Sequence, residues 1–69
     1  MKVGDRFELI KDTSLGGEFY KEGETGVIIQ IIDDMYIDYP IFVAMDNPHP
    51  EDIYKGEWAV SADEIEILN

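Results

Sequence analysis

The side chains in this sequence that could do chemistry are mostly carboxylates. The chain has 16 Asp and Glu residues against 5 Lys and Arg residues, a single His and no Cys. Covalent catalysis needs a nucleophile with an aligned base. The hydroxyl and imidazole candidates are Ser14, Ser61, Thr13, Thr25 and His49, and none of them lies in a recognised nucleophile motif. The sequence therefore predicts no catalytic residue and a protein that is not an enzyme.

The histidine and the carboxylates also bear on metal binding. His49 lies between two prolines, which favour an exposed, extended loop rather than a site. A chain with no Cys and one His cannot form a disulfide framework or a Cys/His zinc site. The acidic stretches 33–38 and 46–52 lack the alternating ligands and central glycine of an EF-hand loop. We therefore expect neither a metal site nor a cofactor.

Negative charge is concentrated in the second half of the chain. The formal net charge at pH 7 is -11, of which residues 1–32, with six acids and four bases, contribute -2. Residues 33–69 carry ten acids and one base, a net charge of -9. The ten acids are Asp33, Asp34, Asp38, Asp46, Glu51, Asp52, Glu57, Asp63, Glu64 and Glu66. Because an acidic surface repels phosphate, we expect these ten to bind a basic protein, with no direct nucleic-acid or membrane binding.

The elements that must position these carboxylates are short strands. A chain of 69 residues is one domain, residues 1–69. Glycines and prolines divide it into short apolar runs that predict five strands, at residues 3–11, 25–32, 39–45, 57–60 and 65–68. A polar segment, residues 12–24 with Gly16 and Gly17, separates the first two strands. Ser61 and Glu64 have the spacing of a capping box, which predicts one helical turn before the last strand.

Alternation within these strands predicts which side chains fill the interior. Residues spaced by two in a strand share a face. The predicted core is Val3, Phe7, Leu9, Val27, Ile29, Ile41, Val43, Trp58, Ile65 and Ile67. This phase leaves Ile28, Ile32 and Phe42 outside, and an exposed apolar patch usually marks an interface. These three residues therefore predict a homodimer interface.

The order of five strands with one helical turn resembles the SH3-like small barrels, over nearly the whole chain. Residues 3–7 resemble the opening strand of that superfamily, residues 23–28 its second-strand entry, and residues 39–43 its third strand. The Tyr39-Pro40 start and the Asp63-Glu64-Ile65 ending are similar to the photosystem I accessory subunit and the variable chain of ferredoxin-thioredoxin reductase. Gly23 and Gly26 resemble the turn of KOW modules. The resemblance implies an all-β, five-stranded antiparallel small barrel.

Charge and resemblance together favour a non-enzymatic binding protein. Small acidic proteins of this kind resemble phage-encoded inhibitors that imitate the charge of DNA, which implies a basic DNA-binding partner such as a nucleoid-associated protein or RNA polymerase. The absence of an apolar N-terminal run favours a cytoplasmic protein, in the host cytoplasm if phage-encoded. Acidic surfaces also confer solubility, which leaves a purely solubilising role open.

Two other functions stay open from the sequence. The family resemblance implies a structural accessory subunit of a redox or electron-transfer complex. The aromatic residues favour a peptide-binding face, because aromatic rings attract cations and pack against polyproline. These residues are Tyr20, Tyr36, Tyr39, Phe42, Tyr54 and Trp58.

Overall fold

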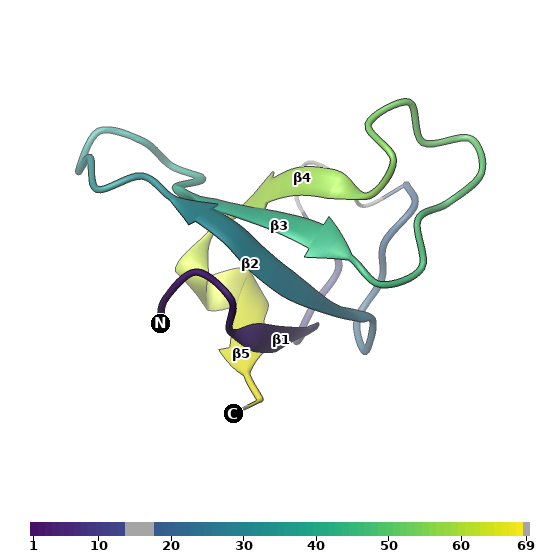
Figure 1. The fold of residues 1–69 in the computed structure, drawn as a ribbon, viewed down its shortest axis with the longest axis horizontal. Helices are drawn as coiled ribbons and strands as arrows, with labels where there is room; N and C mark the ends of the chain where they lie inside the picture. Colours follow the sequence, from purple (N-terminus) through teal and green to yellow (C-terminus); the bar gives the residue numbers. More distant parts are fainter. Residues whose placement is uncertain (14–17, 69) are drawn as a thin grey trace.

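The protein is all-β. The computed structural model describes residues 1–13 and 18–68. The elements are β1 (Arg6–Leu9), β2 (Thr25–Ile31), β3 (Ile41–Met45), β4 (Glu57–Val60), a 3₁₀ turn η1 (Ala62–Glu64) and β5 (Ile65–Ile67). All neighbouring strands are antiparallel, in the order β4-β3-β2-β1-β5 (Figure 1). Ser14, Gly16 and Gly17, singled out in the sequence, lie outside the described residues.

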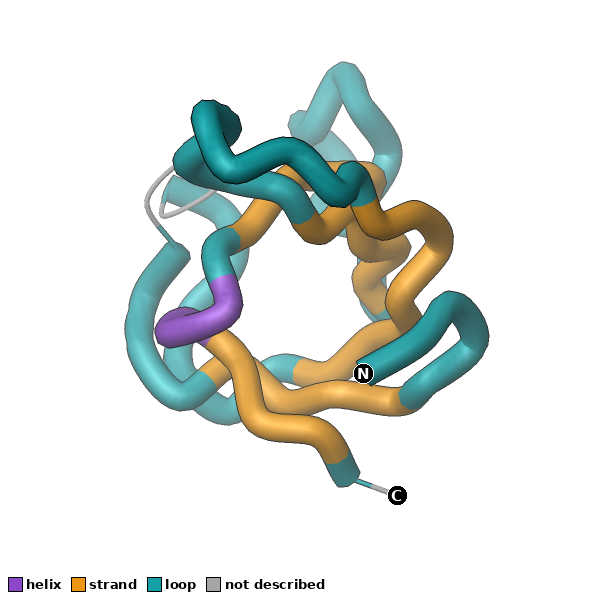
Figure 2. The backbone as a smooth tube through the Cα atoms, turned by 90° about the vertical axis from the view of Figure 1, so that its left-hand side faces the viewer, coloured by secondary structure: helices purple, strands orange, loops and turns teal. Residues whose placement is uncertain are grey.

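The sheet curls into a small barrel. Figure 2 looks along the ring that the strands form and shows η1 in the interval between β4 and β5, the two ends of the strand order. The capping box predicted from Ser61 and Glu64 is present, because the Ser61 backbone N–H donates to Glu64 Oε1 at 2.8 Å. The predicted five-stranded antiparallel small barrel with one helical turn before the last strand is therefore confirmed.

The barrel interior contains most of the residues that the strand alternation predicts. Phe7, Leu9, Ile41, Val43 and Ile65 are buried in it. Val27, Trp58 and Ile67 are half-buried. Val3 is 58% exposed and its predicted place in the core is wrong. The reason is a turn before β1, in which Asp5 N–H donates to the Lys2 carbonyl and Gly4 has a φ of 95°.

In β2 the residues that face the barrel interior are the opposite set to the one predicted. Ile28 is 1% exposed and Ile29 is 40% exposed. Gly26 pairs directly with Phe7, and opposite residues of an antiparallel pair share a face, so Gly26 and Ile28 face inward. The Phe7 ring occupies the space over Gly26, where an added Cβ would lie 2.9 Å from two ring atoms. Val27 and Ile29 therefore face outward, Val27 half-buried and Ile29 exposed, and placing these two residues in the core was wrong.

The orientation of β2 also removes one residue from the predicted dimer interface. Ile28 belongs to the core, so the prediction that it lies at an interface is wrong. Ile32 and Phe42 are half-buried. Homodimerisation through these two residues stays a prediction.

Candidate protein-binding surface

The ten carboxylates of residues 33–69 fall into three groups in the folded protein. Asp52 and Glu64 are buried. Asp46 and Asp63 form ion pairs with cations of the first strand region. The remaining six are exposed and form no ion pair within residues 1–13 and 18–68; they are Asp33, Asp34, Asp38, Glu51, Glu57 and Glu66. We call these six the unpaired carboxylates.

Asp52 is a buried, hydrogen-bonded residue. Its side chain is 4% exposed. Its Oδ2 accepts hydrogen bonds from the Tyr20 hydroxyl, from Trp58 Nε1 at 2.7 Å and from Gly56 N–H at 2.8 Å. Its Oδ1 accepts from Tyr54 N–H at 2.8 Å. Burial raises the pKa of Asp52, but these four hydrogen bonds outweigh burial and lower the pKa to about 2. Asp52 therefore has a structural role and offers little exposed surface to a partner.

Glu64 is also structural. It is 1% exposed, and Oε1 accepts both the backbone N–H and the hydroxyl of Ser61, at 2.8 and 3.0 Å. Strand β5 begins only at Ile65. Of the two glutamates near the end of the chain that were counted among the ten acids, only Glu66 is therefore exposed. Glu66 lies directly opposite Glu8 in the β1–β5 pairing, which places two like charges side by side.

Asp46 and Asp63 are exposed, but cations of the same chain partly neutralise them. Asp46 pairs with the Arg6 guanidinium and accepts from Thr25 Oγ1 at 2.6 Å. Asp63 accepts from Lys11 Nζ at 2.8 Å and from the Ser61 hydroxyl. The hydrogen bonds from Arg6 and Lys11 hold the pKa of Asp46 and of Asp63, respectively, below the ordinary value. A basic partner would have to compete with these internal pairs.

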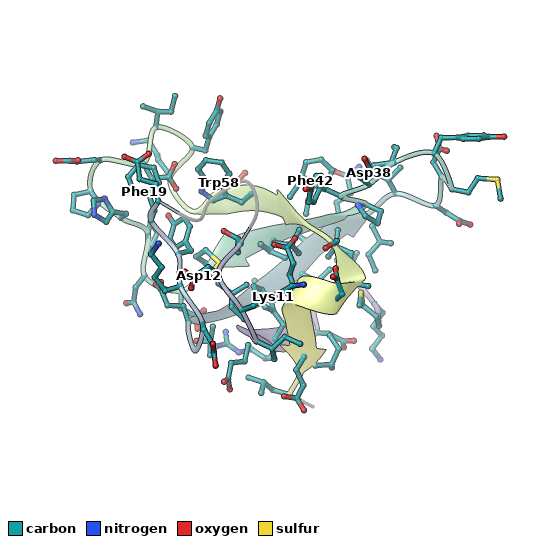
Figure 3. The ribbon with its side chains drawn as sticks, turned by 180° about the vertical axis from the view of Figure 1, so that it is seen from behind. Lys11, Asp12, Phe19, Asp38, Phe42 and Trp58 are labelled. Atoms are coloured by element: carbon teal, nitrogen blue, oxygen red, sulfur yellow. The ribbon has the colours of Figure 1, made fainter. Side chains whose placement is uncertain are left out.

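Three of the unpaired carboxylates lie together in the loop between β2 and β3. We call residues 33–38 the acidic arm. The loop extends away from the barrel in Figure 1, and Figure 3 shows Asp38 on this projection. No Lys or Arg occurs between Lys21 and Lys55 in the sequence, so the arm contains no cation of its own. The arm therefore concentrates negative charge at one end of the molecule.

The other three unpaired carboxylates are dispersed. Glu51 lies in the loop between β3 and β4, which Figure 1 shows on the side of the barrel away from the arm. Glu57 is the first residue of β4, and Glu66 lies in the middle of β5. The sequence predicted that all ten acids bind a partner, whereas in the structure three of the six unpaired carboxylates share the arm and the other three lie on different elements.

The arm also exposes apolar side chains, which the charge analysis did not identify as functional. Met35 is 87% exposed and Tyr36 is 88% exposed. Asp34 orders the turn that carries them, because Asp34 Oδ1 accepts Tyr36 N–H at 2.9 Å and the Asp34 carbonyl accepts Ile37 N–H at 3.2 Å. The run Asp33-Asp34-Met35-Tyr36 could have indicated this exposed turn from the sequence, because turn-forming acids stand next to large apolar residues.

Aromatic side chains gather on the side of the barrel away from the acidic arm (Figure 3). In this aromatic cluster, Phe19 lies 4.8 Å from His49 and 6.4 Å from Trp58 between ring centroids. The Trp58 ring centroid also lies 5.1 Å from that of Tyr54 and 6.3 Å from that of the buried Tyr20. His49 is exposed, as predicted, but it packs against Phe19.

The predicted aromatic face is only partly assembled. Tyr20, Tyr54 and Trp58 come together, whereas Tyr36 lies at the tip of the acidic arm. Figure 3 shows Phe42 on the arm side of Trp58, away from Phe19. Phe19 and His49 were missed by the sequence analysis, although an adjacent pair of aromatic residues in a polar loop is an available signal.

Within residues 1–13 and 18–68 no pocket is present, and no three His, Cys, Asp or Glu side chains converge on a possible metal position. None of the helical segments in this described part has the length and apolar character needed to cross a bilayer. A scan against protein-family models and a search of curated proteins found no match to this chain.

Proposed function

We propose that this protein is a non-enzymatic acidic binding protein that occupies a basic, DNA-binding surface of another protein in place of DNA. The observation that carries the proposal is the set of six unpaired carboxylates on a chain of net charge -11, three of them gathered on the acidic arm. Exposed carboxylates on such a surface stand where phosphates would contact Lys and Arg. The protein acts as an inhibitor by occupancy, without chemistry.

Electrostatics gives this binding two properties. Opposite charge accelerates association at low salt, since the long-range field steers the two proteins together. Salt screens exposed charges, so affinity falls as ionic strength rises. Partners of the required chemistry are nucleoid-associated proteins and RNA polymerase, as for a phage-encoded inhibitor acting in the host cytoplasm.

The test is displacement of DNA. A fluorescent DNA duplex is bound to a purified histone-like nucleoid protein, and separately to RNA polymerase, and anisotropy is followed as this protein is added at about 50 and about 200 mM salt. We expect displacement from one of them, weaker at the higher salt. No displacement from either at the lower salt contradicts the proposal.

Charge variants make the test specific. Asp33→Asn, Asp34→Asn and Asp38→Asn together remove three charges, and Asn at position 34 still accepts the Tyr36 N–H. The matched control, Glu18→Gln, Glu22→Gln and Glu24→Gln, removes three charges outside the unpaired carboxylates, and Gln at position 24 still accepts the Lys21 N–H. The arm variant should lose displacement more than the control. Equal losses would mean that only the total charge matters, as expected for a solubilising surface.

A second candidate function rests on the aromatic cluster. Trp58 is half-buried with its indole N–H held by Asp52, and Tyr54 is 58% exposed, so two ring faces are held at a fixed angle at the surface. Such a face suits a peptide with Arg, Lys or Pro side chains. Peptide-array binding that is lost in Tyr54→Ser but retained in the arm variant would favour this function. An accessory role in a redox complex stays a prediction from family resemblance.

A further inference from the structure

We infer that the tip of the acidic arm is the docking element of the complex, with Met35 and Tyr36 entering an apolar pocket of the basic partner. This inference rests on the proposed function and names the surface that carries it. The pocket on the partner is bordered by Lys and Arg side chains that meet Asp33, Asp34 and Asp38. Association is then apolar at its centre and ionic at its rim.

The tip of the arm is the most exposed apolar part of the described residues. Met35 and Tyr36 are 87% and 88% exposed, the two highest values among the large apolar side chains of the described residues. Tyr and Met are enriched in the centres of protein interfaces. Tyr is also among the residues that dominate binding free energy.

Hydrogen bonds order the tip before any partner binds. The Asp34 carbonyl accepts Ile37 N–H, which makes Met35 and Tyr36 the two central residues of a β-turn. The Asp34 side chain closes the same turn by accepting Tyr36 N–H at 2.9 Å. Ile32 N–H donates to the Pro40 carbonyl at 2.8 Å and joins the two ends of the loop. A tip held in this way loses less conformational freedom on docking.

The charge around the tip favours a basic protein as the partner. Asp33, Asp34 and Asp38 flank the tip and form no ion pair within the described residues. A second copy of this chain, at a net charge of -11, would bring carboxylates against carboxylates. A nucleic acid or an anionic lipid surface would be repelled for the same reason. A protein surface with Lys and Arg around an apolar pocket complements both the tip and its flanks.

The test separates apolar from ionic docking in the DNA-displacement assay with the histone-like protein and RNA polymerase. Met35→Ser with Tyr36→Ser keeps every charge and removes the apolar tip. We expect it to need about tenfold more protein for half-displacement at both salt concentrations. The triple Asn variant should instead lose most at low salt and show a flatter salt dependence. Ile53→Ser, at an 81% exposed position of the other long loop, is the control and should match the wild type.

Each outcome decides one of the two proposals. If the double Ser variant displaces DNA like the wild type while the triple Asn variant is weakened, docking is ionic only; the inference is wrong and the proposed function stands. If the wild type displaces DNA from neither protein, the proposed function fails, and the docking inference fails with it. Circular dichroism of each variant verifies that the fold is retained.

Discussion

Trp58 donates its indole N–H to the buried carboxylate of Asp52 at 2.7 Å, linking β4 to the loop that precedes it. The same oxygen accepts the Tyr20 hydroxyl, so one carboxylate joins the two long loops to the sheet. Peptide, indole and phenol donors together stabilise the negative charge. A residue that the sequence presents as one acid among ten is thus a structural centre.

Replacing this carboxylate should destabilise the fold. In Asp52→Asn an amide N–H₂ must face at least one of the donors that now point at the carboxylate, because Tyr54 N–H binds one oxygen and Gly56 N–H the other. We expect a clearly lower midpoint of urea unfolding. The neighbouring, exposed Glu51→Gln is the control and should keep the wild-type midpoint. An unchanged midpoint in Asp52→Asn would contradict the structural role.

The contribution of Asp52 to stability should depend on pH. Its pKa is lowered in the folded protein from an ordinary 3.8 to about 2. A lowered folded-state pKa means that the unfolded chain binds the proton more tightly, so this stabilisation is complete above the ordinary value and is lost as pH falls towards about 2. Thermal midpoints measured from pH 5 downwards should therefore fall less steeply in Asp52→Asn than in the wild type. Parallel curves would argue against this linkage.

Two neighbouring isoleucines should differ strongly in their contribution to stability. Ile28 lies in the core and Ile29 is 40% exposed. Ile28→Ala should lower the free energy of unfolding by about 2–5 kcal/mol, because it leaves a cavity. Ile29→Ala should change it by only about 0.5 kcal/mol. Urea titration of both variants checks the phase of β2, and the reverse order would restore the phase expected from the sequence.

Gly26 should not tolerate a side chain. A Cβ at this position would lie 2.5 Å from the Ala44 carbonyl oxygen and 2.9 Å from the Phe7 ring. Both neighbours are held in place, one by β-sheet pairing and one by the core. Gly26→Ala should therefore cost about 1–3 kcal/mol of unfolding free energy through overpacking. Wild-type stability in this variant would show that Phe7 does not cover Gly26 as described.

Local pattern by itself predicted much of the fold. The alternation around Phe7 and Leu9 located β1, and the residues of β4 match the predicted range 57–60. Ser61 and Glu64 specified the helical turn, because a capping box depends only on residues three apart in the chain. These elements were predictable because their determinants are neighbours in sequence.

Features that depend on distant contacts came only from the tertiary structure. Every residue from Val27 to Ile29 is apolar, so the sequence alone does not show which face of β2 points into the core. The packing of Phe7 over Gly26 determines that face. Likewise, Asp52 differs from Glu51 because Trp58 and Tyr20, the latter 32 residues earlier in the chain, both donate to its carboxylate. Sequence alone determined that the protein is acidic and all-β. Tertiary packing decided which carboxylates are buried or ion-paired and which remain unpaired at the surface. The reason is that burial and hydrogen bonding depend on segments that are distant in the chain.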